Sequence, residues 1–390
     1  MKWEYKTLDQ LGEVSRGRSK HRPRNDPSLF GGKYPFIQTA DVKAANFYIT
    51  EYDTTYNEKG LAQSRLWNPG TLCITIAANI ADTGILAMDA CFPDSVMGFL
   101  PYERIADVRF VKYCFDILQK NCKKISQGAA QDNLSWEKLS TILFPAPPIE
   151  VQTKIADILS TYDNLIENNQ KQIKLLEEAA QRLYKEWFVD LRFPGHENTK
   201  ITDGIPEGWK IQTLSQIADV VMGQSPKSEF YNQNGQGLPF HQGVGSYGTR
   251  FVVDKIYSTS FTRIAEAGSI LFSVRAPVGR LNLTRNRVVI GRGLAAINHR
   301  LGKQSYLFYL LKEHFFKDDV IGNGAIFASI SKDELLAQQF TIPVSNLIEQ
   351  FNVIVSDMDG RIAELAEQVT LLIEARDRLL PKLMSGEIEV

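Results

Sequence analysis

The chain has 390 residues, of which 44% are hydrophobic and 23% are charged, and its formal net charge is −1. This length accommodates two or more domains, and the composition is that of a folded globular protein. No apolar run reaches the roughly 18 residues of a membrane span, and the N-terminus lacks an apolar signal core. We therefore expect a cytoplasmic protein that makes no contact with membranes.

The four cysteines, Cys73, Cys91, Cys114 and Cys122, show no Cys-x-x-Cys spacing. Paired spacing of that kind is typical of zinc sites and of redox motifs. We expect four reduced thiols and no metal site.

Residues 1–148 are predicted to form a first globular domain of the α+β class. The β-prone run at residues 72–76 follows a glycine turn, and a helical pattern covers residues 111–120. Residues 15–24 contain Gly17 and Pro23, which indicate a loop that presents its side chains to solvent. This basic loop carries no acid and has five cations, which are Arg16, Arg18, Lys20, Arg22 and Arg24.

Residues 149–192 are predicted to form a long helix. Apolar residues recur there at steps of three and four, and the first proline-glycine pair comes only at Pro194. A helix of about 35 residues would be about 50 Å long. Asn169 falls on the apolar stripe, where a single polar residue often fixes the register of a helix pair. Two ordinary surface helices on a globular core remain the alternative interpretation.

Residues 193–345 are predicted to form a linker and a second domain that repeats the first. Trp3, Thr7, Leu8, Leu11, Val14 and Gly17 recur with identical spacing as Trp209, Thr213, Leu214, Ile217, Val220 and Gly223. The span from Arg275 to Lys303 again concentrates cations without an acid. The candidate contact residues of this domain are Gln224, Lys227, His241, Arg275, Arg280 and Arg292.

Two cation clusters in repeated domains indicate localised basic surfaces on a chain that is nearly neutral. Arginine suits guanine edges and phosphates, glutamine suits adenine edges, and histidine can hold a phosphate. A solvated surface whose cations pair with acids from elsewhere in the chain remains the alternative.

Residues 346–390 are predicted to form a second long helix, which repeats the first. Leu159, Ser160 and Asp163 match Val355, Ser356 and Asp359 without gaps. One helix with a single apolar stripe is unstable alone, and two related copies can cover each other.

Motifs for bond chemistry are absent from the sequence. We find no Asn-Pro-Pro-aromatic motif for base methylation, no suitably placed Glu-x-Lys for DNA cleavage and no phosphate-binding Walker pattern. We therefore expect no catalysis by this chain. Two other hypotheses stay open: an enzyme with an unrecognised centre, and a scaffold whose globular parts bind protein.

Three stretches resemble the specificity subunits of Type I restriction-modification systems. The first is Tyr-Lys-Glu-Trp-Phe-Val-Asp at residues 184–190, followed by Ile-Pro-Glu-Gly-Trp at residues 205–209. The second covers residues 268–279 and 290–297, and the third is the chain ending at residues 379–388. The likeness extends over essentially the whole chain.

The resemblance implies two target recognition domains separated by two long antiparallel helices. Each domain would contact one half of a bipartite site on double-stranded DNA, and the helix pair would set the spacer. The helices would also dock two modification (methyltransferase) subunits, which recruit restriction/translocase subunits. S-adenosylmethionine, ATP and magnesium would bind those partners, and this chain would hold no cofactor. The helix residues expected at these contacts are Tyr162, Leu176, Leu183, Trp187, Leu365, Leu372 and Leu379.

The first domain departs from the pattern of the family. Many members have Thr-Pro or Ser-Pro after the glycine, whereas this chain has Ser19-Lys20-His21-Arg22. We therefore expect the two domains to recognise different base sequences.

Overall fold

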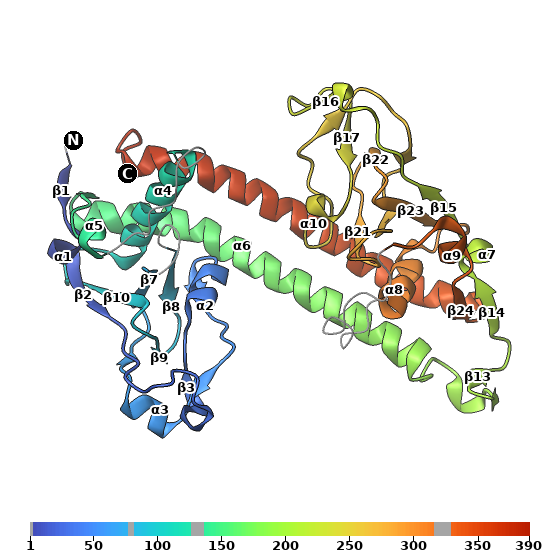
Figure 1. Cartoon of the computed structure of the whole chain (residues 1–390), viewed down its shortest axis with the longest axis horizontal. Coiled ribbons are helices and arrows are strands. Elements are labelled where there is room, and N and C mark those ends of the chain that lie inside the picture. Colours follow the sequence, from blue (N-terminus) through green and yellow to red (C-terminus); the bar gives the residue numbers. More distant parts are fainter. Residues whose placement is uncertain (1–2, 77–81, 126–135, 316–328) are drawn as a thin grey trace. The chain divides into compact units, whose positions relative to one another are not determined.

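The computed structural model describes residues 3–76, 82–125, 136–315 and 329–390, and it divides into two compact units (Figure 1). The first unit consists of Met1–Lys171 and Leu365–Val390, and the second of Gln172–Glu364. The long helices α6 (Ile149–Tyr184) and α10 (Ser345–Met384) each contribute one part to each unit. The finer division of the chain at residues 148, 192 and 345 stays a prediction.

The first unit is built on a sheet with the strand order β2-β10-β7-β8-β4. Its pairs are antiparallel except for β4 and β8, which run parallel. The shorter ladders join β1 to β11, β3 to β5 and β6 to β9. The bounds are β1 Glu4–Lys6, β2 Gly12–Arg16, β3 Phe30–Pro35, β4 Tyr48–Ile49, β5 Thr55–Tyr56, β6 Leu66–Trp67, β7 Leu72–Thr75, β8 Thr83–Leu86, β9 Ala90–Cys91, β10 Val96–Pro101 and β11 Phe144–Ala146.

Besides the two long helices, the helices of the first unit are α1 Leu8–Leu11, α2 Thr39–Ala44, α3 Glu58–Ala62, α4 Val108–Ile125 and α5 Trp136–Leu139, with a 3-10 turn at Pro27–Leu29. Helix α4 shares one buried cluster with the sheet and with both long helices of this unit. Phe110 and Phe115 of α4, Leu72 of β7, Leu159 of α6 and Leu383 of α10 belong to it. The domain therefore rests on the helix pair through α4.

The second unit contains a sheet with the order β15-β23-β20-β21 and another with the order β16-β18-β17-β22-β19. β14 pairs with β24, and β12 pairs with β13. The strands are β12 Ile201–Thr202, β13 Ile205–Pro206, β14 Lys210–Thr213, β15 Ala218–Met222, β16 Tyr231–Asn232, β17 Leu238–His241, β18 Tyr257–Ser258, β19 Ile264–Ala265, β20 Ile270–Ser273, β21 Leu281–Leu283, β22 Val288–Ile290, β23 Leu294–His299 and β24 Gln339–Ile342.

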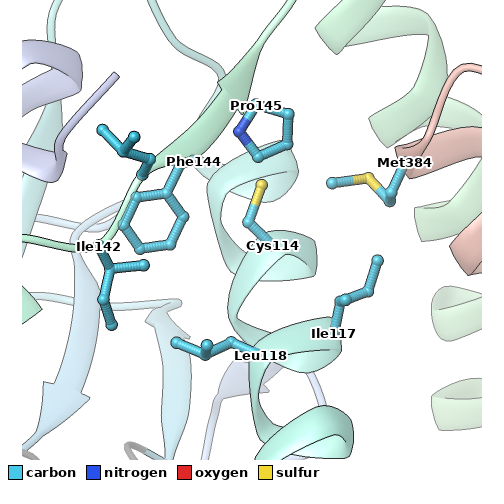
Figure 2. Close-up of a pocket in the computed structure, with 8 residues that line it drawn as sticks. Cys114, Ile117, Leu118, Ile142, Phe144, Pro145 and Met384 are labelled. Carbon is cyan, nitrogen blue, oxygen red and sulfur yellow. The ribbon is translucent and has the colours of Figure 1, made fainter. Parts of the chain in front are cut away.

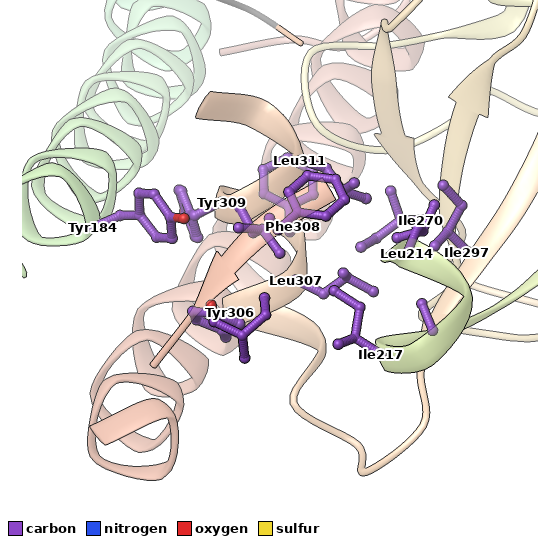
Figure 3. Close-up of a cluster of buried hydrophobic side chains, with 14 of the residues drawn as sticks. Tyr184, Leu214, Ile217, Ile270, Ile297, Tyr306, Leu307, Phe308, Tyr309 and Leu311 are labelled. Carbon is purple, nitrogen blue, oxygen red and sulfur yellow. The ribbon is translucent and has the colours of Figure 1, made fainter. Parts of the chain in front are cut away.

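The helices of the second unit are α7 Leu214–Ile217, α8 Gln304–Phe315 and α9 Lys332–Leu336, with 3-10 turns at His196–Asn198, Ser228–Phe230 and Val244–Ser246. A π-helical turn at Lys185–Val189 follows α6. Figure 3 shows how α8 links this unit together: Tyr306, Leu307 and Tyr309 lie in one buried cluster with Tyr184 of α6 and Ile270 of β20. The second domain thus rests on the helices through α8.

The two units repeat one topology. The order β2-β10-β7-β8 in the first corresponds to β15-β23-β20-β21 in the second, and the ladder β1-β11 corresponds to β14-β24. Even the small helices after β1 and β14 begin alike, with capping boxes between Thr7 and Gln10 and between Thr213 and Gln216. The predicted α+β duplication is confirmed.

Within the first unit the two long helices pack antiparallel. Asn169 of α6 donates a hydrogen bond to Gln368 of α10 at 3.1 Å, and Asp163 of α6 pairs with Arg376 of α10 at 2.5 Å. Residue numbers therefore decrease along α6 in the direction in which they increase along α10. Asn169 makes the polar contact across the helix pair that its place on the apolar stripe predicts.

Candidate nucleic-acid interface

Gly17 fixes the start of the basic loop against the end of the first sheet. Its N–H donates to the carbonyl of Val96 at 2.8 Å, and a Cβ at this position would lie 2.3 Å from the carbonyl oxygen of Pro93. Only glycine fits such a close approach of two backbones. The next residue, Arg18, donates its N–H to Phe92 at 3.0 Å and exposes its side chain.

Gly223 does the same in the second repeat. Its N–H donates to Leu294 at 2.9 Å, and a Cβ would lie 2.1 Å from the carbonyl oxygen of Gly291. Gln224 follows, with its N–H on the carbonyl of Ile290 at 2.9 Å and its side chain exposed. The two loops are therefore held by equivalent backbone contacts.

The side chains of all five basic-loop cations are exposed, as predicted, although two make local contacts. Arg24 donates two hydrogen bonds to Asp94, at 2.7 and 2.8 Å. Arg22 donates to the carbonyl oxygens of Ser19 and His21, both at 2.8 Å. These contacts order the loop and leave Arg16, Arg18 and Lys20 with no side-chain hydrogen bond recorded among the described residues.

Asp26 closes the same loop. Hydrogen bonds from the backbone N–H and then the hydroxyl of Ser28 lower the pKa of Asp26 to about 2, and His21 contributes a further contact at 2.7 Å. A carboxylate that accepts several hydrogen bonds stays ionised at neutral pH. Asp26 thus acts as an N-cap for the 3-10 turn and keeps the loop compact.

Arg65 belongs to this surface, although the sequence reasoning missed it. Its guanidinium lies over the ring of Trp67 at 3.8 Å and donates to the hydroxyl of Ser15 at 3.0 Å. Trp67 in turn stacks on Phe92, with ring centroids 4.7 Å apart. Arg65 directly precedes β6, two residues before Trp67, and no motif of the sequence marked it.

In the second repeat, Gln224, Lys227, Arg275 and Arg292 are exposed and Arg280 is half-buried. The N–H of Arg292 donates to the hydroxyl of Ser225 at 3.2 Å, which places Arg292 beside the loop that begins at Gly223. Lys227 lies 3.8 Å from Glu229. Among the described residues, no acid is recorded within ion-pair distance of Arg275 or Arg292.

Three other cations of the span from Arg275 to Lys303 pair with acids, as expected from the alternative of a solvated, charge-paired surface. Arg287 pairs with Glu266 at 3.1 Å, Arg300 pairs with Asp219 at 3.0 Å, and Lys303 pairs with Glu349. This part of the basic span is thus neutralised at the surface, and the unpaired positive charge lies nearer Arg275 and Arg292.

The prediction that His241 contacts DNA is wrong. His241 ends β17, and its side chain is 0% exposed. Nε2 lies 3.0 Å from Asp254, whereas Nδ1 has no hydrogen-bond partner among the described residues. The parallel pairing of β17 with β22 buries His241. No local sequence pattern predicts that pairing.

Two of the helix residues predicted to bind partners are buried within their own units. Trp187 lies in the buried cluster of the second unit, and Leu365 is 0% exposed. Tyr162, Leu176, Leu183, Leu372 and Leu379 are half-buried. These two side chains are therefore buried in the described structure, and their role as partner contacts stays a prediction. The exposed apolar residues of the helices are Ile158, Leu165, Leu175, Val353, Ile354 and Leu371.

An apolar pocket of about 210 Å³ lies in the first unit beside α4. Figure 2 shows Cys114, Ile117, Leu118, Ile142, Phe144, Pro145 and Met384 around it. Burial raises the pKa of the Cys114 thiol, so this sulfur is not a reactive thiolate at neutral pH. Nothing in this lining suits bond chemistry.

Cys73, Cys91 and Cys114 are free and buried, and the side chain of Cys122 lies outside the described residues. Across residues 3–76, 82–125, 136–315 and 329–390, His, Cys, Asp and Glu side chains form no group of three that could bind a metal ion. Over the same described ranges, every helix is too short or too polar to span a bilayer.

Comparison with known proteins gives one consistent answer. Residues 1–178 and 206–375 both match the family described as Type I restriction modification DNA specificity domain. A putative Type I restriction enzyme MjaX specificity subunit of Methanocaldococcus jannaschii is 34% identical over 281 residues, which are 70% of this chain and 66% of that protein. The MjaIX specificity subunit of the same organism is 26% identical over 409 residues, covering 100% of this chain and 94% of that protein.

The crystal structure of a Type-I restriction-modification system S subunit from M. genitalium has the same fold. Its TM-score is 0.61 at 16% sequence identity, and the alignment covers 98% of this chain and 96% of that one. The matched family segments also coincide with the two repeats, each with its basic or polar loop after a glycine that a Cβ would bring into a backbone clash. The chain belongs to the DNA specificity subunits of Type I restriction-modification systems.

Proposed function

We propose that this chain is the DNA-recognition component of a Type I restriction-modification complex and performs no bond chemistry itself. Each repeat contacts one half of a bipartite site on double-stranded DNA. The observation that carries the proposal is the equivalence of the loops after Gly17 and Gly223. Both are anchored by the same backbone contacts, and both present exposed polar or cationic side chains.

The exposed arginines and lysines of both loops supply affinity for the phosphates of the duplex. Contacts of this kind release counterions, so the affinity falls steeply as the salt concentration rises. Base edges in the major groove are then distinguished by fewer side chains, and these decide the sequence. Arg18, Gln224, Arg275 and Arg292 are the exposed residues best suited to that second role.

The helix pair has two tasks in this proposal. Its length, about 50 Å for a helix of 36 residues, sets the number of unread base pairs between the half-sites. Its exposed apolar residues dock two modification subunits, which recruit restriction/translocase subunits. Leu175 and Leu371 occupy equivalent places in the repeat and are 63% and 58% exposed, which suits two copies of one partner.

S-adenosylmethionine, ATP and magnesium belong to those partner subunits in this proposal. The purified chain then binds no cofactor of its own and neither methylates nor cleaves DNA. Enzymatic activity of the isolated chain would favour the alternative of an unrecognised catalytic centre.

The decisive experiment maps DNA methylation across the genome of the host with the gene for this chain present and deleted. We expect one split motif to lose its methylation on deletion and to regain it when the full chain is supplied again. An unchanged methylation pattern, in a host whose modification subunits are expressed, would contradict the proposal. Footprinting of the full complex on the recovered motif then tests for two protected half-sites.

A further inference from the structure

Besides their strand order, the two repeats share one arrangement of a loop glycine and a tight turn, which we call the frame. In the first repeat, Val96 donates its N–H to the carbonyl of Pro93 at 3.0 Å, which closes a tight turn ahead of β10. In the second repeat, Leu294 donates to the carbonyl of Gly291 at 3.0 Å and closes the same turn ahead of β23. Each turn lies against the glycine of its own repeat, Gly17 or Gly223.

Two positions of this frame are therefore equivalent between the repeats. The first is the residue after the glycine, which is Arg18 in one repeat and Gln224 in the other. The second is the second residue of the turn, which is Asp94 in one repeat and Arg292 in the other. Ser19 and Ser225 follow the first position, so the glycine before it and the serine after it are the same in both repeats.

A guanidinium lies beside the turn in both repeats, but it comes from a different place in the chain in each. Arg292 supplies it directly in the second repeat. In the first repeat Asp94 holds the guanidinium of Arg24 with two hydrogen bonds, at 2.7 and 2.8 Å. A guanidinium thus lies beside the turn in both repeats, paired with Asp94 in the first and without an ion-pair partner among the described residues in the second. The position after the glycine is where the two frames differ in hydrogen-bonding chemistry.

We propose that Arg18 and Gln224 are the equivalent base-discriminating residues of the two half-sites, with Arg18 selecting a guanine and Gln224 selecting an adenine. The inference rests on the proposed function. A guanidinium donates two parallel hydrogen bonds to O6 and N7 of guanine, whereas the amide of glutamine donates to N7 and accepts from the amino group of adenine. Both side chains are exposed, and no hydrogen bond to either side chain is recorded among the described residues.

The backbone around both residues is rigid, which a base-reading position requires. Arg18 and Gln224 each donate their N–H to the opposite strand end, at 3.0 and 2.9 Å, and each follows a glycine that no larger residue can replace. Their Cα positions are therefore fixed relative to the sheet. A side chain on a fixed backbone keeps the geometry that two simultaneous hydrogen bonds to one base need.

The test selects bound duplexes from a library of random sequence, using the full chain assembled with its modification subunits. The wild type is compared with Arg18→Gln and with Gln224→Arg. We expect Arg18→Gln to change the preference from guanine to adenine at one position of one half-site, by roughly 5- to 100-fold, and to leave the other half-site unchanged. Gln224→Arg is expected to make the reverse change in the other half-site.

Two matched variants separate a base contact from a phosphate contact. Lys20→Gln removes the same charge two residues away and should weaken binding to all sequences equally. Arg18→Lys keeps the charge and loses the two-pronged donor, so a base contact loses its preference whereas a phosphate contact keeps most of the affinity.

The outcomes distinguish this inference from the function on which it rests. A wild-type complex that selects no split sequence overturns the proposed function. A wild-type complex that selects a split sequence, together with variants whose preferences are unchanged, overturns only the assignment of Arg18 and Gln224. An equal loss on all sequences in Arg18→Gln also overturns it, because that result marks a phosphate contact.

Discussion

The phenol of Tyr113 donates a hydrogen bond to Oδ2 of the buried Asp163 at 2.5 Å and thereby joins α4 to α6. The second unit repeats this contact between Tyr309 of α8 and Asp359 of α10, at 3.3 Å. The two carboxylates, however, pair with arginines from different places. Asp163 accepts from Arg376 of α10, whereas Asp359 accepts from Arg250 of the second recognition domain. The duplication therefore kept the tyrosine-carboxylate contact and changed its ionic partner.

Replacing Tyr113 by phenylalanine should destabilise the first unit. The substitution keeps the ring but removes the donor, which leaves a buried carboxylate with one hydrogen bond fewer. We expect the free energy of unfolding to fall by about 1–3 kcal/mol, measured by denaturant unfolding of the full chain. Tyr309→Phe is the matched control and should cost less, since its hydrogen bond is longer. Equal losses in the two variants would show that the contacts are energetically equivalent.

Among the described residues of the second unit Arg250 is the one buried cation, and its loss should be costly. Its side chain is 4% exposed, pairs with Asp359 at 2.5 Å and lies 3.9 Å above the ring of Phe308. Arg250→Met leaves the Asp359 carboxylate without its cation, so we expect a loss of about 3–5 kcal/mol in the free energy of unfolding. Arg300→Met breaks an exposed pair with Asp219 and should cost less than about 1 kcal/mol.

The double variant Arg250→Met with Asp359→Asn tests the cause of that loss. Removal of both charges leaves only the half-buried Glu177, which lies 3.8 Å from Arg250, without that cation, so part of the stability should return. A double variant as unstable as Arg250→Met alone would instead assign the loss to the packing of the arginine on Phe308.

Buried and exposed apolar residues of the long helices should separate stability from assembly. Trp187 packs in the core of the second unit, so Trp187→Ala should cost about 3–5 kcal/mol in the free energy of unfolding. Leu175 is 63% exposed, so Leu175→Ala should leave the unfolding free energy within about 0.5 kcal/mol of the wild type. Under the proposed function it should nevertheless weaken binding of a modification subunit, measured by calorimetric titration. Unchanged binding in Leu175→Ala and in Leu371→Ala would exclude this helix surface as the docking site.

The duplication and the long helices could be predicted from the sequence because both depend on patterns within it. The spacing from Trp3 to Gly17 recurs without change, and an apolar stripe at steps of three and four has one simple structural solution. The exposed basic loop could be predicted from Gly17 onward because glycine and proline exclude a regular element there, whereas Ser15 and Arg16 belong to β2.

Pairings between distant segments could not be predicted from these patterns. His241 was predicted to contact DNA from its residue type alone, and the parallel pairing of β17 with β22, a distant segment, places it in the interior. Trp187 follows the apolar stripe of the helix, but the stripe cannot say whether the chain's own domain or another protein covers it. The burial of Arg250 could not be predicted from a single arginine, because the carboxylate that pairs with it lies far along the chain.

The stability of the second unit should depend on pH through His299. Burial, followed by the positive charge of Lys303, lowers the pKa of His299 below its usual 6.5, and the ring nitrogen Nδ1 accepts a hydrogen bond from Leu301 at 3.0 Å. The unfolded state therefore binds more protons than the folded state at mildly acidic pH. Stability that is fully present above about pH 6.5 is then lost as the pH falls through 6.5 toward the lowered pKa.

The measurement compares the melting temperatures of the wild type and His299→Gln at pH 7.5 and pH 5.5. Glutamine does not titrate, so the advantage of the wild type over the variant should shrink at the lower pH. A difference in melting temperature that is the same at both pH values would show that His299 titrates alike in the folded and unfolded chain.

Lengthening both long helices should change the spacer of the DNA target and leave its half-sites intact. Four residues inserted after Lys171 of α6 and four after Glu364 of α10 add about 6 Å to each helix, which is nearly two base-pair steps of about 3.4 Å. Under the proposed function, methylation mapping should return the same two half-sites with a spacer longer by about two base pairs. The same insertion at the exposed tip between β12 and β13, beside Gly204, lengthens neither helix and should leave the spacer unchanged. If the variant with lengthened helices kept the original spacer, as the control variant should, the helices would not set the distance between the half-sites. The separation would then have to come from the partner subunits.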